Sequence, residues 1–141
     1  MAYNGGYNKS NGYSQDKKGG GYDKPQVTIP AIVLDYKNNP NLFDEVAKEI
    51  ANKISKTKST QIRNFYDYVL DLHQNSQVKP FNEVLPFVKM LNSKVAYSKS
   101  RGHSSEEFVL MIQECIKQVN SKEKLEVFKL FFEAVLGFSK K

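Results

Sequence analysis

The feature of this sequence that most restricts its fold is an apolar rhythm of three to four residues, which begins after Pro40 and continues to the C-terminal end. Val, Ile, Leu and Phe recur at the i, i+3, i+4 and i+7 spacing that places side chains on one face of a helix. The rhythm predicts five helices, over residues 42–56, 59–73, 82–102, 104–119 and 121–138. Because their connections are short, we expect an all-α fold, a compact bundle of about five helices.

Polar residues and one glycine mark the expected helix ends. Ser59 or Thr60 is suited to cap the second helix, and Ser104-x-x-Glu107 has the spacing of a capping box before the fourth. Gly102 follows the last periodic residue of the third helix, as a C-terminal stop does.

Pro86 lies inside the third apolar pattern and needs an explanation. If Asn82 is the N-cap, Pro86 falls in the first turn, where its missing N–H would have no helical partner. The third helix is therefore expected to continue past its proline.

The last segment, 121–138, is apolar nearly all round. We therefore expect it to be the central helix, and its wide apolar band favours partial cover by a second copy or a neighbouring subunit.

The N-terminal part has a different composition. Residues 1–26 are rich in Gly, Tyr, Asn, Lys and Ser, and no Val, Ile, Leu or Phe precedes Val27. Such a segment buries too little apolar surface to offset its conformational entropy, so we expect a disordered tail over 1–26 and a helical bundle domain over 27–141. The tail's tyrosines and lysines suit stacking on and pairing with RNA; a solubilising tail is the simpler alternative. Pro25, Pro30 and Pro40 predict an extended arm packed on the core before the first helix.

Several classes of function find no support in the sequence. The 141 residues contain no apolar run of membrane-spanning length and no secretory signal core, so a soluble, cytoplasmic protein is expected. The single Cys115 lies among apolar residues and is interpreted as a small core side chain. His73 and His103 lie on different segments, and no metal, P-loop or nucleophile–base motif is present. We expect no enzymatic activity, no catalytic residue, no metal and no cofactor.

Charge is strongly segregated along the chain. After residue 26, 17 basic and 13 acidic residues leave a net charge of +4. Two stretches, 50–66 and 84–105, contain four basic residues each and no acid: Lys53, Lys56, Lys58 and Arg63 in the first, and Lys89, Lys94, Lys99 and Arg101 in the second. The rest of this part carries −4. Because acid-free surfaces do not repel a polyanion, the pattern indicates phosphate binding.

Spacing places some of these cations together. Lys94, Tyr97 and Arg101 share one side of the third helix, although Lys99 and Arg101 would also offset the negative end of the helix dipole. Tyr97 could stack on a base, but we expect its ring to cap the core. The cations Lys56, Lys58 and Arg63 straddle the turn before the second helix, where free backbone N–H groups also face a phosphate; a solvated surface turn is the alternative.

Three blocks carry a resemblance to a known family: "STQIRNFYDYVLDL", "LNSKVAYSKSRG" and "FKLFFEAVLGF". In order and separation they resemble the small α-helical subunit of the type III-A CRISPR effector, the Csm complex. The shared motifs are Thr60-Gln61-Ile62-Arg63, Lys94-x-Ala-Tyr97 with Arg101, and the segment 128–135. The resemblance spans roughly residues 42–138.

The resemblance implies a non-catalytic subunit with a role in antiviral defence. Copies would stack along the crRNA-bearing backbone and line the groove where guide and target RNA pair, while cleavage belongs to the backbone and large subunits. The implied partners are crRNA, target RNA, those subunits and neighbouring copies. RNA backbone contacts are carried over to Arg63, Lys94 and Arg101, whereas Lys56, Lys58, Lys89 and Lys99 rest on charge alone. A free-standing nucleic-acid-binding protein and a helical protein adaptor remain alternatives.

Overall fold

The computed structural model describes residues 27–139, and within this range the chain is helical without a strand. A π-helical turn, η2 (Leu42–Val46), leads into α1 (Ala47–Lys53), which is followed by α2 (Ser59–Ser76), α3 (Phe81–Ser100), α4 (Glu106–Gln118) and α5 (Lys122–Ser139). The predicted all-α bundle of five helices is confirmed. The predicted disorder and RNA contacts of residues 1–26 lie outside the described residues.

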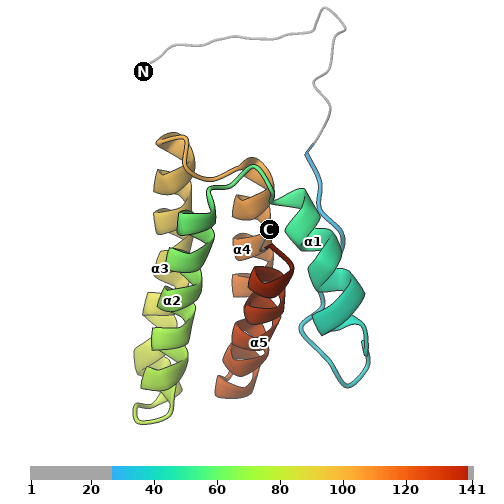
Figure 1. The fold of residues 1–141 in the computed structure, drawn as a ribbon. Helices are drawn as coiled ribbons and strands as arrows, with labels where there is room; N and C mark the ends of the chain where they lie inside the picture. Colours follow the sequence, from blue (N-terminus) through green and yellow to red (C-terminus); the bar gives the residue numbers. More distant parts are fainter. Residues whose placement is uncertain (1–26, 140–141) are drawn as a thin grey trace, which may run out of the picture.

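The long helices stand side by side, and their connections alternate between the two ends of the bundle. In Figure 1, α2 and α3 form an antiparallel hairpin, α4 returns behind α5, and α1 lies at a slant beside α5. The α1–α2 and α3–α4 connections therefore lie at the same end, opposite the α2–α3 turn. None of the helices within 27–139 combines the length and apolarity that a bilayer crossing requires.

The core is built around α5, as its wide apolar band predicts. This helix packs against both α1 and α2, and Phe128, Phe131 and Phe132 are fully buried. Phe108 of α4 meets Phe132 edge to face, with ring centroids 6.2 Å apart, and meets Phe65 of α2 at 5.5 Å. These edge-to-face contacts are the geometry that aromatic quadrupoles favour, and they connect three helices through one aromatic cluster.

The segment before η2 is the extended arm that its prolines predict. Ile32 and Leu34 are buried, while Val33 between them is exposed. The side chain of Gln118 holds this arm, because its Nε2 donates to the Ile32 carbonyl at 2.7 Å and its Oε1 accepts from the Leu34 amide at 2.8 Å. The Lys124 ammonium also donates to the Leu34 carbonyl. The side-chain amide of Gln118 thus forms hydrogen bonds with the backbone of the arm, as the backbone of a neighbouring strand would.

The start of α3 differs from the prediction. The helix begins at Phe81, directly after Pro80 with its extended ψ of 144°, so Asn82 is not the cap. Pro86 is consequently the sixth helical residue and lies outside the first turn, contrary to the prediction. Its missing N–H leaves the Asn82 carbonyl without a helical donor. Both residues are exposed, so water is able to serve that carbonyl, and the helix continues as expected.

The caps of α2 and α4 were also mispredicted. Lys58 flanks α2 and makes no side-chain cap, so neither Ser59 nor Thr60 is the N-cap. At α4 the cap is Ser105, whose Oγ accepts from the Phe108 amide at 3.2 Å. The capping box predicted from Ser104 is therefore wrong by one residue.

The end of α3 follows the prediction. Gly102 has φ +77°, a left-handed conformation that favours glycine. Its amide donates to the Lys99 carbonyl at 2.9 Å, and the His103 amide donates to the Ser98 carbonyl at 2.9 Å. This pair of bonds is a Schellman motif, which satisfies the last carbonyls of the helix.

Candidate nucleic-acid interface

The fold brings parts of the two acid-free stretches together at one end of the bundle, residues 56–58 of the first and 101–105 of the second. The α1–α2 connection carries Lys56 and Lys58, and the α3–α4 connection begins at Arg101. The two connections touch, because the Lys58 amide donates to the His103 carbonyl at 3.4 Å. Cations that lie more than forty residues apart in sequence therefore share one surface.

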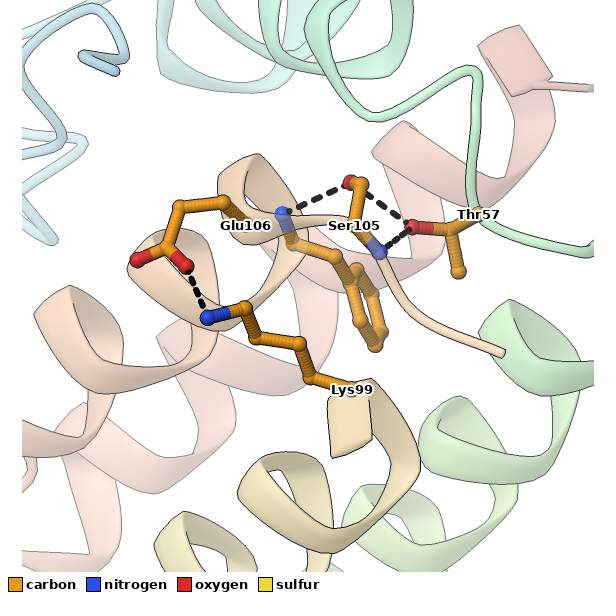
Figure 2. A network of polar contacts seen from close by, with 5 residues as sticks. Thr57, Lys99, Ser105 and Glu106 are labelled. Atoms are coloured by element: carbon orange, nitrogen blue, oxygen red, sulfur yellow. Dashed lines mark hydrogen bonds and ion pairs between the residues drawn. The ribbon is translucent and has the colours of Figure 1, made fainter. Parts of the chain in front are cut away.

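A pair of hydroxyl side chains joins these connections. Thr57 is 4% exposed. Its Oγ1 lies 2.9 Å from the Ser105 Oγ and accepts a hydrogen bond from the Ser105 amide at 3.0 Å. Figure 2 shows these bonds together with the capping hydrogen bond that the Phe108 amide donates to the Ser105 Oγ. The residue that starts α4 thus also fixes the loop before α2.

A second set of polar contacts joins the α3–α4 connection to α2 and α3. The Ser98 hydroxyl donates to Gln61 Oε1 at 2.9 Å and lies 2.6 Å from the Ser104 hydroxyl, which consequently serves as the donor between the two serines. Ser98 and Ser104 are buried. These bonds explain why Ser104 is unavailable as a cap, and they tie the first turn of α2 to the last turn of α3.

Tyr97 is exposed, and the prediction that it caps the core is wrong. Its exposed fraction is 63%, since Val95 and Ser98 occupy the inward positions of α3. Instead, the Tyr97 hydroxyl accepts from Arg101 Nη1 at 3.1 Å, and the Arg101 guanidinium lies 5.7 Å from the centre of the ring. The predicted association of Tyr97 with Arg101 on one side of α3 is present. The pair places an aromatic ring and a guanidinium together in solvent.

Lys94 forms a similar pair with Tyr68 of α2, a residue that the sequence analysis missed. The Lys94 ammonium donates to the Tyr68 hydroxyl at 3.0 Å and lies 4.6 Å from the ring centre. No pattern in the sequence identifies this contact, because it joins two helices across 26 residues. Lys94 and Arg101 are seven residues apart on α3, about 10 Å along its axis. Two tyrosine–cation pairs therefore lie along the same side of the hairpin.

Two predicted cations have carboxylate partners. Lys99 Nζ lies 2.6 Å from Glu106 Oε1 (Figure 2), and Arg63 Nε lies 3.5 Å from Asp67 Oδ1. Both pairs are exposed, so each is weak, but the carboxylate competes with an incoming phosphate. Counting charges along the stretch 84–105 did not include Glu106, which begins the next helix and approaches Lys99 in space.

The remaining predicted cations differ in position. Within residues 27–139, no carboxylate lies at ion-pair distance from Lys56, Lys58, Lys94 or Arg101. We call these four side chains, with Tyr68 and Tyr97, the basic end. Lys89 is exposed but lies twelve residues before Arg101 on α3, about 18 Å along the axis, and is not part of it. The basic end presents donors and positive charge with no carboxylate at ion-pair distance among the described residues, and donors with positive charge are what binds phosphate.

Three side chains were considered for catalysis or metal binding on sequence grounds: Cys115, His73 and His103. They lie on different elements of the fold. Cys115 is fully buried, and burial raises the pKa of its thiol, as expected for a core side chain. His73 and His103 are half-buried on separate elements. Among residues 27–139, no group of three or more His, Cys, Asp or Glu side chains has an arrangement that could hold a metal ion.

Comparison with known proteins identifies one family. The family model described as Csm2 Type III-A matches residues 37–141, which include η2, every α-helix and the whole of the basic end. Comparisons with curated proteins and with solved structures gave no match.

Proposed function

The chain belongs to the Csm2 family of type III-A CRISPR effector subunits, and from this premise we propose that it is a non-catalytic subunit that holds RNA backbone at its basic end. In this role it lines the groove where crRNA and target RNA pair. Its partners are the two RNA strands, the backbone and large subunits of the complex and neighbouring copies of itself. It acts in the cytoplasm, through a helical domain spanning residues 27–141.

The observation that carries the proposal is the meeting of two acid-free stretches at one end of the bundle. The Thr57–Ser105 bonds hold Lys56 and Lys58 on the same end as Arg101. A subunit that serves many guides needs contacts that are blind to base sequence, and cations directed at phosphates meet that need.

The geometry ranks the predicted RNA contacts. Arg101 and Lys94 come first, because each donates to a tyrosine hydroxyl and no carboxylate within residues 27–139 lies at ion-pair distance from either. Lys56 and Lys58 come second, as exposed cations on the connection beside them. The other three predicted residues are auxiliary: Arg63 and Lys99 with their carboxylate partners, and the distant Lys89.

The proposed lack of catalysis is supported by the positions of the reactive side chains. The Cys115 thiol is buried with a raised pKa, and the two histidines lie on different elements. A thiol that remains protonated in the core does not act as a nucleophile. Purified alone with Mg²⁺, the chain is expected to leave labelled RNA uncut; cleavage that co-purifies with the wild-type chain and is lost in a basic-end variant would contradict this.

Charge reversal at the basic end tests the RNA proposal. The double variant Lys58→Glu/Arg101→Glu is expected to weaken binding of a guide–target RNA duplex by at least about tenfold and to lower the salt slope by about two, since two phosphate contacts are lost. Binding is measured across a salt series by fluorescence anisotropy. The thermal unfolding midpoint is expected to stay unchanged, because both side chains are exposed.

A matched control separates local contact from net charge. Lys79→Glu/Lys122→Glu makes the same change in charge at the opposite end, beside the α2–α3 turn and the start of α5. Its RNA affinity is expected to remain near that of the wild type. If both double variants bind equally well, or equally poorly, the basic end is not the RNA contact.

A further inference from the structure

A pocket of about 290 Å³ lies where α1 ends, α2 begins and α5 ends. These three helix ends lie toward the same end of the bundle (Figure 1). Thr57, which links the α1–α2 and α3–α4 connections, is part of the lining, so the pocket adjoins the basic end. Neither Tyr68 nor Tyr97 lines it, and the pocket is therefore separate from the two tyrosine–cation pairs.

The inner side of this pocket is apolar and one wall is aromatic. Ala51 and Ile62 line it and are almost fully buried. Phe138, near the end of α5, also lines the pocket but is 41% exposed, so the core leaves much of this side chain uncovered. An apolar pocket with an accessible aromatic ring suits a flat ligand that stacks on the ring.

Three polar side chains in the same lining are available to a ligand. Within residues 27–139, the side chains of Asn52, Ser55 and Ser59 neither donate nor accept a hydrogen bond. The Asn52 amide carries a donor next to an acceptor. The Watson–Crick edge of each RNA base also carries a donor next to an acceptor, and an amide matches either order by turning over. The lining therefore fits a nucleobase without selecting one of the four.

Lysines adjoin the lining residues along the chain. Lys53, Lys56 and Lys58 are each a direct sequence neighbour of a residue that lines the pocket. All three are exposed, and within residues 27–139 no carboxylate lies at ion-pair distance from them. A base that enters the pocket brings a phosphate to its rim, where these cations attract it. The aromatic ring, the amide and the lysines together match the parts of a nucleotide.

We propose that this pocket binds the base of one unpaired nucleotide in the RNA that the basic end holds. The base stacks on the Phe138 ring, its edge meets the Asn52 amide, and its phosphate lies beside Lys56 and Lys58. A base inside a continuous duplex does not enter, because its edge is paired and its faces are stacked. The pocket thus distinguishes RNA with an unpaired base from continuous duplex. This inference rests on the proposed RNA contact, whereas the affinity of the pocket for a base does not.

Three RNA duplexes that differ at one position test the proposal: one fully paired, one with a single unpaired nucleotide, and one in which that nucleotide is abasic. Fluorescence anisotropy measures binding of the full chain. The duplex with the unpaired base is expected to bind at least about fivefold more tightly than the abasic one, with adenine and uracil giving the same gain. Equal affinity for the unpaired base and the abasic position would overturn the proposal.

Substitutions in the pocket assign the gain to named side chains. Phe138→Leu is expected to abolish it and Phe138→Tyr to keep it, because tyrosine retains a stacking ring. Asn52→Leu is expected to reduce the gain. Phe87→Leu is the matched control, since Phe87 is 56% exposed but does not line this pocket. All four variants are expected to bind the fully paired duplex as the wild type does, and a gain that survives in Phe138→Leu would contradict the stacking role.

Mononucleotides test the pocket without the RNA contact. In NMR spectra of the full chain, AMP and UMP are each expected to shift the side-chain signals of Asn52 and Phe138, whereas ribose 5-phosphate leaves them in place. Signals that stay unchanged with both nucleotides, or that move equally with ribose 5-phosphate, would overturn the assignment. The two proposals fail separately: Arg101→Glu reports on the duplex contact from outside the pocket, and Phe138→Leu reports on the base while the basic end is intact.

Discussion

Thr57 Oγ1 accepts the backbone amide of Ser105 at 3.0 Å and lies 2.9 Å from its hydroxyl, across 48 residues of sequence. This relationship is the closest link between the α1–α2 and α3–α4 connections. Ser105 also caps α4 through the Phe108 amide, so one residue starts a helix and positions a neighbouring loop.

Replacing Thr57 with valine keeps the shape of the side chain and removes this link. The Ser105 amide loses its acceptor in a part-buried position, so Thr57→Val is expected to lower the free energy of unfolding by about 1–3 kcal/mol. Urea denaturation measures the change. Thr60→Val is the control: Thr60 is exposed, and its replacement is expected to stay within about 0.5 kcal/mol. Equal stability of the two variants would show that the Thr57 hydroxyl contributes nothing.

Two glycines are expected to respond to alanine with opposite signs. At Gly102, φ is +77°, so Gly102→Ala forces a side chain into the left-handed region and is expected to cost about 1 kcal/mol. At Gly137 in α5 no neighbouring atom lies within 4 Å of the added Cβ, and φ is not positive, so Gly137→Ala is expected to stabilise the chain by about 0.5–1 kcal/mol. Thermal unfolding midpoints that shift in the same direction would contradict this account.

Glu106 is expected to oppose RNA binding while it supports the fold. Glu106→Gln releases Lys99 from its 2.6 Å ion pair and removes a negative charge near the basic end, so duplex RNA affinity is expected to rise about two- to fivefold at low salt. The same change removes a favourable charge from the first turn of α4 and is expected to cost about 0.3–1 kcal/mol of stability.

The control for this prediction is Glu114→Gln, which breaks the Lys117 pair farther along α4. That variant is expected to leave RNA affinity unchanged. If the two variants bind RNA equally, the location of Glu106 has no bearing on binding.

Cys115 is expected to make the free energy of unfolding fall as the pH rises in the alkaline range. Burial raises the pKa of its thiol in the folded chain, whereas the unfolded chain has the ordinary value of about 8.5. Above about pH 8.5 the folded chain therefore keeps a proton that the unfolded chain loses. The contribution of Cys115 to the free energy of unfolding is complete below this pH and declines as the pH rises. The difference in unfolding free energy between the wild type and Cys115→Ala is expected to fall by about 1.4 kcal/mol per pH unit above this value.

Denaturation curves collected from neutral to alkaline pH measure this difference. Burial and Glu133 also raise the pKa of Tyr66, but this residue is present in both variants and cancels. Parallel stability curves for the two chains would refute the assignment.

The helices could be predicted because the apolar spacing that marks the buried face of each helix lies within that helix's own sequence. The apolar spacing in 121–138 predicts a central helix, and α5 carries three fully buried phenylalanines. Caps were less predictable, because Ser104 and Ser105 are adjacent and chemically identical. Tertiary contacts decide between them: Ser98 engages Ser104, and Thr57 engages Ser105. Thr57 lies 48 residues away from Ser105 in sequence, and Ser98 belongs to the preceding helix.

The candidate site was predictable in its charges and not in its pairings. Spacing placed Tyr97 beside Arg101 correctly, but its ring was expected in the core. The small, polar Ser98 occupies the inward position instead, because Gln61 and Ser104 satisfy its hydroxyl there. Likewise, counting charges in a window could not reveal that Glu106 approaches Lys99 from the next helix. Such contacts depend on how the helices pack, which local sequence does not specify.

The link between Thr57 and Ser105 also orders events during synthesis. A ribosome makes the chain from its N-terminal end, so α1, α2 and α3 are synthesised before residue 105. The α2–α3 hairpin carries Lys94 and Arg101 as soon as it has formed. The contact between residues 57 and 105, which closes a loop of 48 residues, has to wait until the start of α4 is made. Lys56 and Lys58 therefore gain their fixed position relative to Arg101 only once residue 105 has been made.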